Sequence, residues 1–247
     1  MASSGANVIK ETGDIILGSP LLSFLIPQEQ NQFKHHVFVE WNSKKASTLD
    51  RILKHFGYSN YDIFRGDCNN EAYRIPFNQI GHYFCFIDCE GLDIKWSTLE
   101  HLLQYRGDIL LVFQTSETNR VFSKAKRGYN MKALDDFCGG NWWQSCNDIN
   151  DLFNQYANRV KQKADNLRGF DNFVDYVRVM GRGGSFYYDV ILICRKGPYV
   201  KAWLDLKERL SNLKDKHVKL APNICKGELI TLLEFFERKQ SKLDYFF

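Results

Sequence analysis

The sequence lacks several features that would place it in a special class of protein. No apolar run reaches the length of about eighteen residues that a membrane span needs. The opening residues, MASSGANVIKETGD, lack the basic segment followed by an apolar segment that marks a secretory signal. Proline is scarce, with five residues in 247, which argues against a disordered Pro-rich chain. We therefore expect a folded cytoplasmic protein, or a nuclear one in a eukaryote.

Metal-binding and hydrolase motifs are also missing. The seven cysteines include no Cys-x-x-Cys pair, and four metal ligands at usable spacing are not visible, so we expect no metal. An odd number of cysteines without a signal peptide fits reduced thiols rather than a disulfide framework. The chain contains no Walker loop, no HExxH motif and no Ser-His-Asp order. Hydrolase chemistry is therefore not indicated.

The composition that remains is typical of a globular protein. Hydrophobic residues make up 44% of the chain, aromatic residues 15% and charged residues 25%, with a formal net charge of +4. Lys and Arg outnumber acids between residues 119 and 168 and again in the C-terminal part. A nucleic-acid partner and a solvated helical face explain these basic runs equally well.

Apolar periodicity predicts an α/β fold. Short apolar runs at 37–40, 61–64, 83–87 and 109–113 predict strands, and spacing near 3.6 predicts helices at 43–56 and 96–105. Strands that alternate with helices favour a mostly parallel sheet covered on both faces. Residues 119–168 are predicted as a helical insertion, and 174–180 and 186–194 as a β-hairpin around the glycine-rich 181–184. Further helices are predicted at 200–213 and 228–238.

Three acidic residues fall at the ends of consecutive predicted strands. Glu40 ends the first of them, Asp67 follows the second, and Asp88 ends the third. In open α/β sheets, ligands bind beyond the carboxyl ends of the strands. The three acids therefore favour a nucleoside site, and Glu40 suits the two hydroxyls of a ribose. Each acid is also an ordinary residue for a turn or a strand end.

Several motifs together resemble one family. Gly18-Ser19-Pro20, VFVEWN, GDCN, FIDCEGL, DILLVF and FCGGNWW are similar to the three-Cys-motif partner proteins (TcmP), from about residue 12 to 203. These are methyltransferase-like Rossmann proteins found near a radical S-adenosylmethionine-type protein. The resemblance implies S-adenosylmethionine as cofactor, with Glu40 on its ribose and Asp67 by its adenine. It places Asp88 at the substrate, as the candidate catalytic residue.

The chain departs from this family in two places. Class I methyltransferases open with a strand and a glycine-rich cofactor turn, and this chain begins inside such a turn, at Ser4-Gly5-Ala6-Asn7. The first strand is expected to be missing, either lost or encoded upstream of Met1, which leaves Gly5 as a cofactor-binding candidate. Where the family has an Asp-Pro-Phe-Gly-like motif, this chain has Asp88-Cys89-Glu90-Gly91, without an aromatic residue to stack on a flipped base.

The last eight residues, QSKLDYFF, look like a PIP box, the peptide that docks on the sliding clamp PCNA. One tight helical turn would put Leu243, Phe246 and Phe247 on one side, with Gln240 free to hydrogen-bond. The alternative is that both Phe side chains pack into the core of this protein. Clamp binding would indicate an archaeal host or one of its viruses.

These observations define the expected domains and two functions. Residues 1–213 are expected to form the methyltransferase-like domain, 214–239 a helical extension and 240–247 the clamp peptide. The first hypothesis is a clamp-bound accessory protein of DNA replication, repair or modification that has lost its cofactor. The second is an active nucleic-acid methyltransferase working with a radical-type partner. Trp142 and Trp143 either stack on a base or anchor the insertion.

Overall fold

A computed structural model describes residues 2–8, 15–25, 33–180, 187–197 and 199–211. The described residues form two compact units, Ala2–Gly66 and Asp67–Ser211, each of which is described by itself. The predicted helix at 228–238, the clamp peptide at 240–247 and the glycine-rich 181–184 lie outside the described residues.

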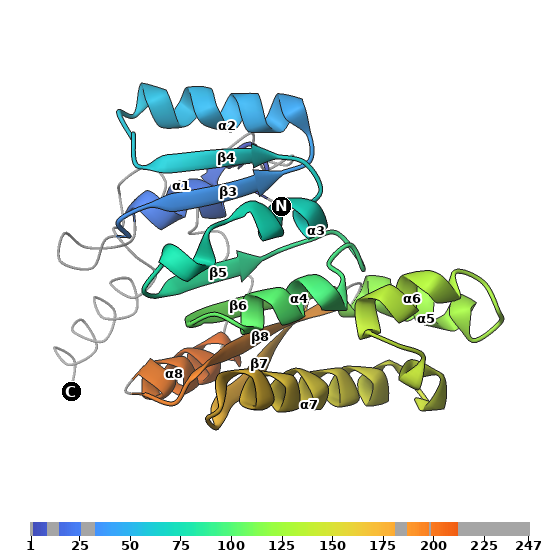
Figure 1. The fold of residues 1–247 in the computed structure, drawn as a ribbon. Helices are drawn as coiled ribbons and strands as arrows, with labels where there is room; N and C mark the ends of the chain where they lie inside the picture. Colours follow the sequence, from blue (N-terminus) through green and yellow to red (C-terminus); the bar gives the residue numbers. More distant parts are fainter. Residues whose placement is uncertain (1, 9–14, 26–32, 181–186, 198, 212–247) are drawn as a thin grey trace, which may run out of the picture. The chain divides into compact units, whose positions relative to one another are not determined.

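The first unit contains two pairs of strands and two helices (Figure 1). β1 (Ala6–Val8) pairs antiparallel with β2 (Ile15–Leu17), and β3 (His36–Glu40) pairs parallel with β4 (Tyr61–Arg65). α1 (Ser19–Leu25) follows β2, and α2 (Ser43–His55) connects β3 to β4. The predicted strand–helix–strand segment from 37 to 64 is therefore confirmed.

The sequence of α2 explains both its start and its buried face. The side chain of Asn42 accepts hydrogen bonds from the backbone N–H groups of Lys44 and Lys45, which caps the helix. Ala46, Leu49 and Leu53 follow at intervals of three and four residues and are fully buried. The two leucines pack with Leu21 and Phe38 in the core of this unit.

The second unit is built on a four-stranded sheet in the order β5-β6-β8-β7. Its strands are β5 (Tyr83–Ile87), β6 (Gly107–Phe113), β7 (Asn172–Met180) and β8 (Tyr187–Arg195). Its helices are α3 (Cys68–Glu71), α4 (Trp96–Leu103), α5 (Thr115–Ala125), α6 (Met131–Cys138), α7 (Ile149–Arg168) and α8 (Tyr199–Ser211), with short 3₁₀ turns at 72–74, 77–79 and 142–145. The predicted helical content of 119–168 and the two predicted strands at 174–180 and 186–194, which pair antiparallel, agree with these elements.

The expectation of a mostly parallel sheet is wrong for this unit. β5 and β6 are parallel, but β8 is antiparallel to both β6 and β7. The hairpin itself is the reason. β7 and β8 are joined by a short connection, and two strands joined in this way can only pair antiparallel. Because β8 also pairs with β6, this antiparallel pair and the parallel pair β5–β6 belong to one mixed sheet.

Alternation along β6 shows that the sheet is covered on both faces at this strand, whereas Phe84 and Phe86 of β5 are exposed. Ile109, Leu111 and Phe113 belong to the larger core, together with buried side chains of α4 to α7. Leu110 points the other way, into a smaller cluster that includes Trp203 of α8. Side chains alternate between the faces of a strand, so a continuous apolar run serves two helical layers at once (Figure 1).

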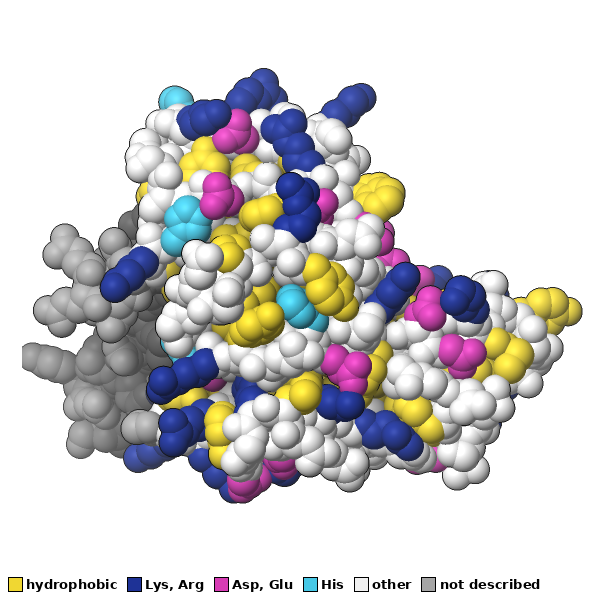
Figure 2. Space-filling model, in the orientation of Figure 1, with side chains coloured by type: hydrophobic (Ala, Val, Ile, Leu, Met, Phe, Trp, Pro, Cys, Tyr) yellow, Lys and Arg dark blue, Asp and Glu magenta, His cyan; other side chains and the backbone are white. Residues whose placement is uncertain are grey.

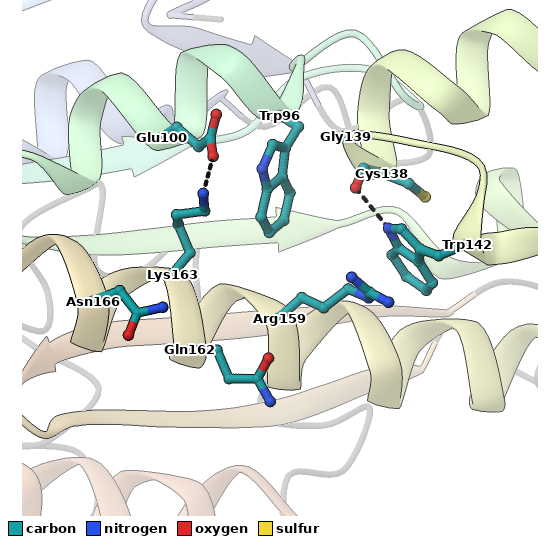
Figure 3. A pocket seen from close by; sticks show the side chains of 9 residues that line it. All are labelled: Trp96, Glu100, Cys138, Gly139, Trp142, Arg159, Gln162, Lys163 and Asn166. Atoms are coloured by element: carbon teal, nitrogen blue, oxygen red, sulfur yellow. Dashed lines mark hydrogen bonds and ion pairs between the residues drawn. The ribbon is translucent and has the colours of Figure 1, made fainter.

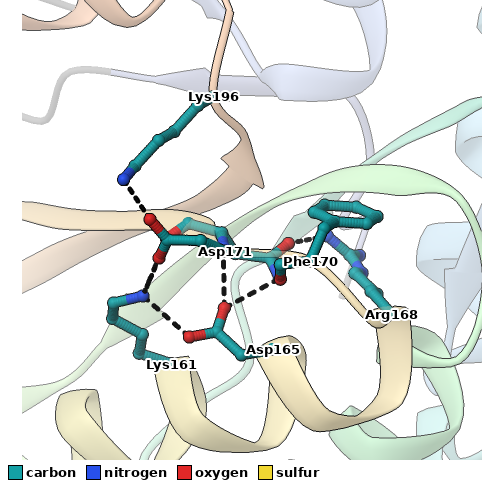
Figure 4. Close-up of polar contacts among 7 residues, drawn as sticks. Lys161, Asp165, Arg168, Phe170, Asp171 and Lys196 are labelled. Carbon is teal, nitrogen blue, oxygen red and sulfur yellow. Dashed lines mark hydrogen bonds and ion pairs between the residues drawn. The ribbon is translucent and has the colours of Figure 1, made fainter.

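A polar network closes the turn between α7 and β7 (Figure 4). The Asp165 carboxylate accepts hydrogen bonds from the backbone and side chain of Asn172, at 2.6 and 3.0 Å. Lys161 contacts both Asp165 and Asp171, and Lys196 also contacts Asp171. Hydrogen bonds from the two lysines lower the pKa of Asp171 to about 2. This network holds the register in which β7 enters the sheet.

Candidate functional site at the strand ends

Glu40, the candidate ribose ligand, ends β3 of the first unit with its side chain engaged by the protein itself. Its Oε2 accepts the backbone N–H of Ser3 at 2.7 Å, and its Oε1 accepts that of Asn42 at 2.8 Å. The residue is 2% exposed. Ser3 has a φ of 60°, in the left-handed region that disfavours a side chain, so its bond to Glu40 offsets local strain.

These contacts do not fit a carboxylate held open for ribose hydroxyls. Residues 2 and 3 lie against the end of β3, where the Ala2 N–H also donates to the Val39 carbonyl at 3.0 Å. A carboxylate that accepts two backbone N–H groups is satisfied within the fold. The cofactor role of Glu40 stays a prediction.

Gly5, the second candidate from the first unit, is buried in apolar packing. Its φ is +82°, and a Cβ built on it would lie 2.9 Å from Leu49 Cδ1 and 3.3 Å from Leu21 Cγ. The N–H of Gly18 donates to its carbonyl at 2.7 Å. Glycine is required here by close packing inside the unit. Its cofactor role also stays a prediction, and Ala6 and Asn7 of the expected turn belong to β1.

In the second unit, Asp67 caps α3 and is joined to a second loop through Asn69. Asp67 Oδ1 accepts the backbone N–H and the side-chain amide of Asn69, both at 2.9 Å. The same amide donates to the Asp93 carbonyl at 2.7 Å, and Asn69 Oδ1 accepts from Lys95 N–H and the Thr98 hydroxyl at 2.8 Å. Asn69 thus uses every hydrogen-bonding group of its amide to hold the two loops together.

Two thiols make the second link between these loops. Cys68 Sγ and Cys89 Sγ lie 3.7 Å apart. Cys68 is partly exposed and Cys89 is buried, so the contact lies at the edge of the core. The hydrogen bond between them raises the pKa of Cys68 and lowers that of Cys89. The loops that carry Asp67 and Asp88 are therefore brought together by the fold.

The loop after β5 concentrates negative charge. Asp88 is exposed at its surface, yet the loop removes enough hydration to raise the pKa of its carboxyl, and the charge of Glu90 adds to this. The pKa of Asp93 is raised by partial desolvation first, then by the charges of Glu90, Asp67 and Glu117. These five acids share one small region of the second unit, which we call the acidic edge: Asp67, Asp88, Glu90, Asp93 and Glu117.

A buried ion pair lies at the neighbouring strand ends. Asp189 of β8 is completely buried and binds the Arg178 guanidinium through both oxygens, at 2.8 and 3.0 Å. Its Oδ2 also accepts the hydroxyl of Thr115 at 2.5 Å, where α5 begins. This bidentate pair ties the hairpin to the start of α5.

Sequence reasoning found the acids at the strand ends but missed what connects them. Asn69 and the Cys68–Cys89 contact join residues far apart in the chain, and no local pattern marks such partners. Glu90 and Asp93 were visible in the acidic stretch that follows β5. The structure brings Asp67 and the Asp88 loop together within the second unit, whereas Glu40 and Gly5 belong to the first unit.

Three further observations concern the described residues. On the face drawn in Figure 2, Lys and Arg side chains are interspersed with Asp and Glu. Within the described ranges, no group of three or more His, Cys, Asp or Glu residues could hold a metal ion. The helices of those ranges include none long and apolar enough to cross a membrane.

Comparison with known proteins gives remote structural likenesses. The chain matches no protein-family model and no curated protein. Among solved structures, it is similar to the O-methyltransferase TomG from Streptomyces achromogenes, involved in tomaymycin synthesis, in complex with S-adenosylmethionine (SAM). Identity is 15%, with 66% of this chain and 62% of that chain covered, at a TM-score of 0.37. The match therefore spans less than two thirds of that methyltransferase, and so remote a likeness transfers no activity.

The acidic edge offers proton transfer as its chemistry. A carboxyl with a raised pKa holds its proton closer to neutral pH than an ordinary aspartate does, which suits a general acid or base. The same negative charge repels the phosphates of a nucleic acid. Phosphate contacts would therefore need basic residues elsewhere on the chain.

Proposed function

We propose that this chain is a methyltransferase-like accessory protein that docks on the PCNA sliding clamp and has lost S-adenosylmethionine binding. Its context would be DNA replication, repair or modification. The observation that carries the loss of cofactor is the state of Glu40, whose two carboxylate oxygens bind the N–H groups of Ser3 and Asn42. The residue is also 2% exposed, so a ribose could reach these oxygens only by opening this part of the fold and leaving backbone donors unpaired, which is unfavourable in a buried position.

Clamp docking rests on the sequence of the last eight residues. Gln240, Leu243, Phe246 and Phe247 have the spacing Gln-x-x-aliphatic-x-x-aromatic-aromatic. Three apolar side chains on one helical turn would fill a hydrophobic groove, and Lys242 with its basic neighbours would meet an acidic rim. Tethering would raise the local concentration of the protein at DNA without contacts of its own to DNA.

A second function is favoured by the acidic edge. An active S-adenosylmethionine-dependent nucleic-acid methyltransferase would need a proton acceptor at the substrate, and the raised pKa of Asp88 suits that role. In this alternative, Asp67 would contact the adenine of the cofactor. DNA would be the substrate, and a radical-type protein the working partner.

Titration with S-adenosylmethionine separates the two functions. We expect no shift in melting temperature and no calorimetric heat up to about 1 mM cofactor, because a ligand that binds only the native state must stabilise it. Saturable binding that is lost in Glu40→Gln but kept in Asp62→Asn would contradict the proposal and establish the alternative. Asp62 is an exposed acid of the same unit and serves as the matched control.

Calorimetry with PCNA from the same organism tests the docking peptide. The full chain should bind, and both a version ending at Arg238 and the double variant Phe246→Ala, Phe247→Ala should not. Phe56→Ala removes a phenylalanine that is 61% exposed on the first unit, and this control should bind as the full chain does. Equal binding by the double variant would exclude clamp docking through these two phenylalanines. It would favour the alternative, in which both side chains pack into the core of this protein.

A further inference from the structure

A cavity of about 310 Å³ lies on the helical side of the second unit, apart from the acidic edge. Figure 3 shows it between α4, the end of α6, the turn at 142–145 and α7. Two indoles line it, from Trp96 and Trp142, together with Glu100 of α4, Cys138 and Gly139 at the end of α6, and four polar side chains of α7: Arg159, Gln162, Lys163 and Asn166. The volume of this cavity is at the lower end of the range for small-molecule sites, and it has room for one ligand the size of a nucleotide.

Both indoles are fixed by the fold. The Trp142 Nε1–H donates to the Cys138 carbonyl at 2.8 Å, which sets the plane of its ring. Trp96 packs edge-on against the buried Tyr156, with ring centroids 5.6 Å apart. A Cβ at Gly139 would lie 2.4 Å from the Trp96 ring, so the glycine allows the chain to approach that indole. The walls are therefore preorganised, which lowers the entropic cost of binding.

The charge in the cavity is positive. The Arg159 guanidinium lies 4.4 Å from the centroid of the Trp142 ring, in a cation–π contact. Among the described residues, no carboxylate forms an ion pair with Arg159, whereas Lys163 pairs with Glu100 at 2.5 Å. The exposed amides of Gln162 and Asn166 lie on the same face of α7 and supply both donors and acceptors. The cavity thus combines flat aromatic surfaces, an unpaired cation and amide groups.

We propose that this cavity binds a nucleotide, with the base against the indoles and the phosphate at Arg159. Aromatic side chains and guanidinium planes stack on bases of any sequence, and arginine matches the geometry of a phosphate. A neutral or purely apolar ligand would leave the charge of Arg159 unused. The nucleotide is either free or one unit of a single strand, since both present the same chemistry.

Titration with AMP and with a single-stranded oligonucleotide of about twelve nucleotides tests the proposal and separates the two sources. Binding is followed by quenching of tryptophan fluorescence and by calorimetry. We expect AMP to bind at least about tenfold more tightly than adenosine or inorganic phosphate, because each of these lacks one half of the recognised group. Binding of AMP indicates a free nucleotide, and binding of the oligonucleotide alone indicates a strand.

Variants locate the site. Arg159→Gln and Trp142→Leu should each weaken binding by about tenfold or more, and Trp142→Phe, which keeps an aromatic plane, by less. Arg120→Gln removes an exposed arginine of α5 that pairs with Glu117, and this matched control should bind as the unaltered chain does. Melting curves check that each variant is folded, and Arg159 is exposed, so its loss leaves the core intact.

Two results would overturn the proposal. One is the absence of binding by both AMP and the oligonucleotide below about 1 mM. The other is binding that Arg159→Gln and Trp142→Leu leave unchanged, which would place the ligand elsewhere. Clamp docking is tested separately, because the cavity uses no residue of the clamp peptide.

Discussion

The two units treat the carboxylates at their strand ends in opposite ways. In the first unit, Glu40 is buried and each of its oxygens accepts a backbone N–H. In the second unit, Asp88 and Asp93 lie in a loop where partial desolvation and nearby acids raise the pKa of both carboxyls. The first carboxylate is engaged by hydrogen bonds within the fold, whereas the surroundings of the second pair disfavour the charged form.

This difference separates structural from functional candidates. A carboxylate satisfied by its own backbone contributes to the stability of the fold and needs no ligand. Like charges held close together reduce stability, and such arrangements persist most often where a site needs them. Glu40 therefore contributes to the stability of its unit, its cofactor role stays a prediction, and the acidic edge is the better place to look for chemistry.

The largest effect is expected at Asp189, whose carboxylate, like that of Glu40, has its hydrogen-bond partners within the fold. Asp189→Ala should lower the free energy of unfolding by about 3 kcal/mol, because it leaves Arg178 and the Thr115 hydroxyl without their partner. The estimate is at the low end for a buried pair, since the Arg178 side chain is 34% exposed. Urea unfolding measures it, and an effect below about 0.5 kcal/mol, as at ordinary surface positions, would contradict a structural role.

Glu40→Gln should lower the free energy of unfolding by about 2 kcal/mol. Glutamine has one acceptor oxygen where the carboxylate has two, so its amide NH₂ must face a backbone N–H of either Ser3 or Asn42. Chemical denaturation compares this variant with Asp62→Asn, an exposed acid of the same unit, which should change stability by less than about 0.5 kcal/mol. Equal effects in both variants would remove the contrast between a satisfied carboxylate and an exposed one.

The acidic edge should respond in the opposite direction. Asp93→Asn removes a charge that its neighbours disfavour, so it should raise stability at neutral pH, by less than Glu40→Gln lowers it. Because the folded-state pKa of Asp93 is raised, the stability that its protonated form contributes is present below the unfolded pKa and is lost as pH rises through the folded one. The gain in the variant should therefore appear above the raised pKa and vanish at low pH, as measured by melting curves across pH. A destabilised variant at neutral pH would show that the Asp93 carboxylate is bound favourably.

Local patterns in the sequence were sufficient to predict the helices and strands, but not to predict which strands pair and in which direction. The apolar runs at 37–40 and 83–87 predicted strands correctly, although Phe84 and Phe86 of the second run are exposed, and Asn42 caps a helix through its nearest neighbours. The parallel sheet was wrong because partner choice is a long-range property. Once the hairpin places β8 beside β6, the sheet is mixed, whatever each strand looks like alone.

The same limit applies to the candidate site. Acids at strand ends can be read from the sequence, and Asp67 and Asp88 do lie in loops that the fold joins. Whether a carboxylate has hydrogen-bond donors or faces other negative charges depends on partners such as Ser3, which lies 37 residues from Glu40 in the sequence. Such a partner has no signature in the sequence. The cavity of Trp96 and Trp142 was hidden in the same way, because one indole comes from a helix and the other from a turn 46 residues later.

The smallest effect tests whether charge repulsion is shared across the acidic edge. The charge of Glu90 raises the pKa of both Asp88 and Asp93, whereas that of Glu117 acts on Asp93 and not on Asp88. Glu90→Gln should therefore lower the pKa of both aspartates slightly, and Glu117→Gln that of Asp93 alone, as read from carboxyl carbon chemical shifts in an NMR titration. Both aspartates are near solvent, so added salt should reduce the pKa shifts.

If Glu117→Gln changed the pKa of both aspartates equally, these acids would respond to net charge rather than to specific neighbours. Selective shifts would show instead that the loop after β5 fixes its carboxyls at defined positions, which a general acid or base requires.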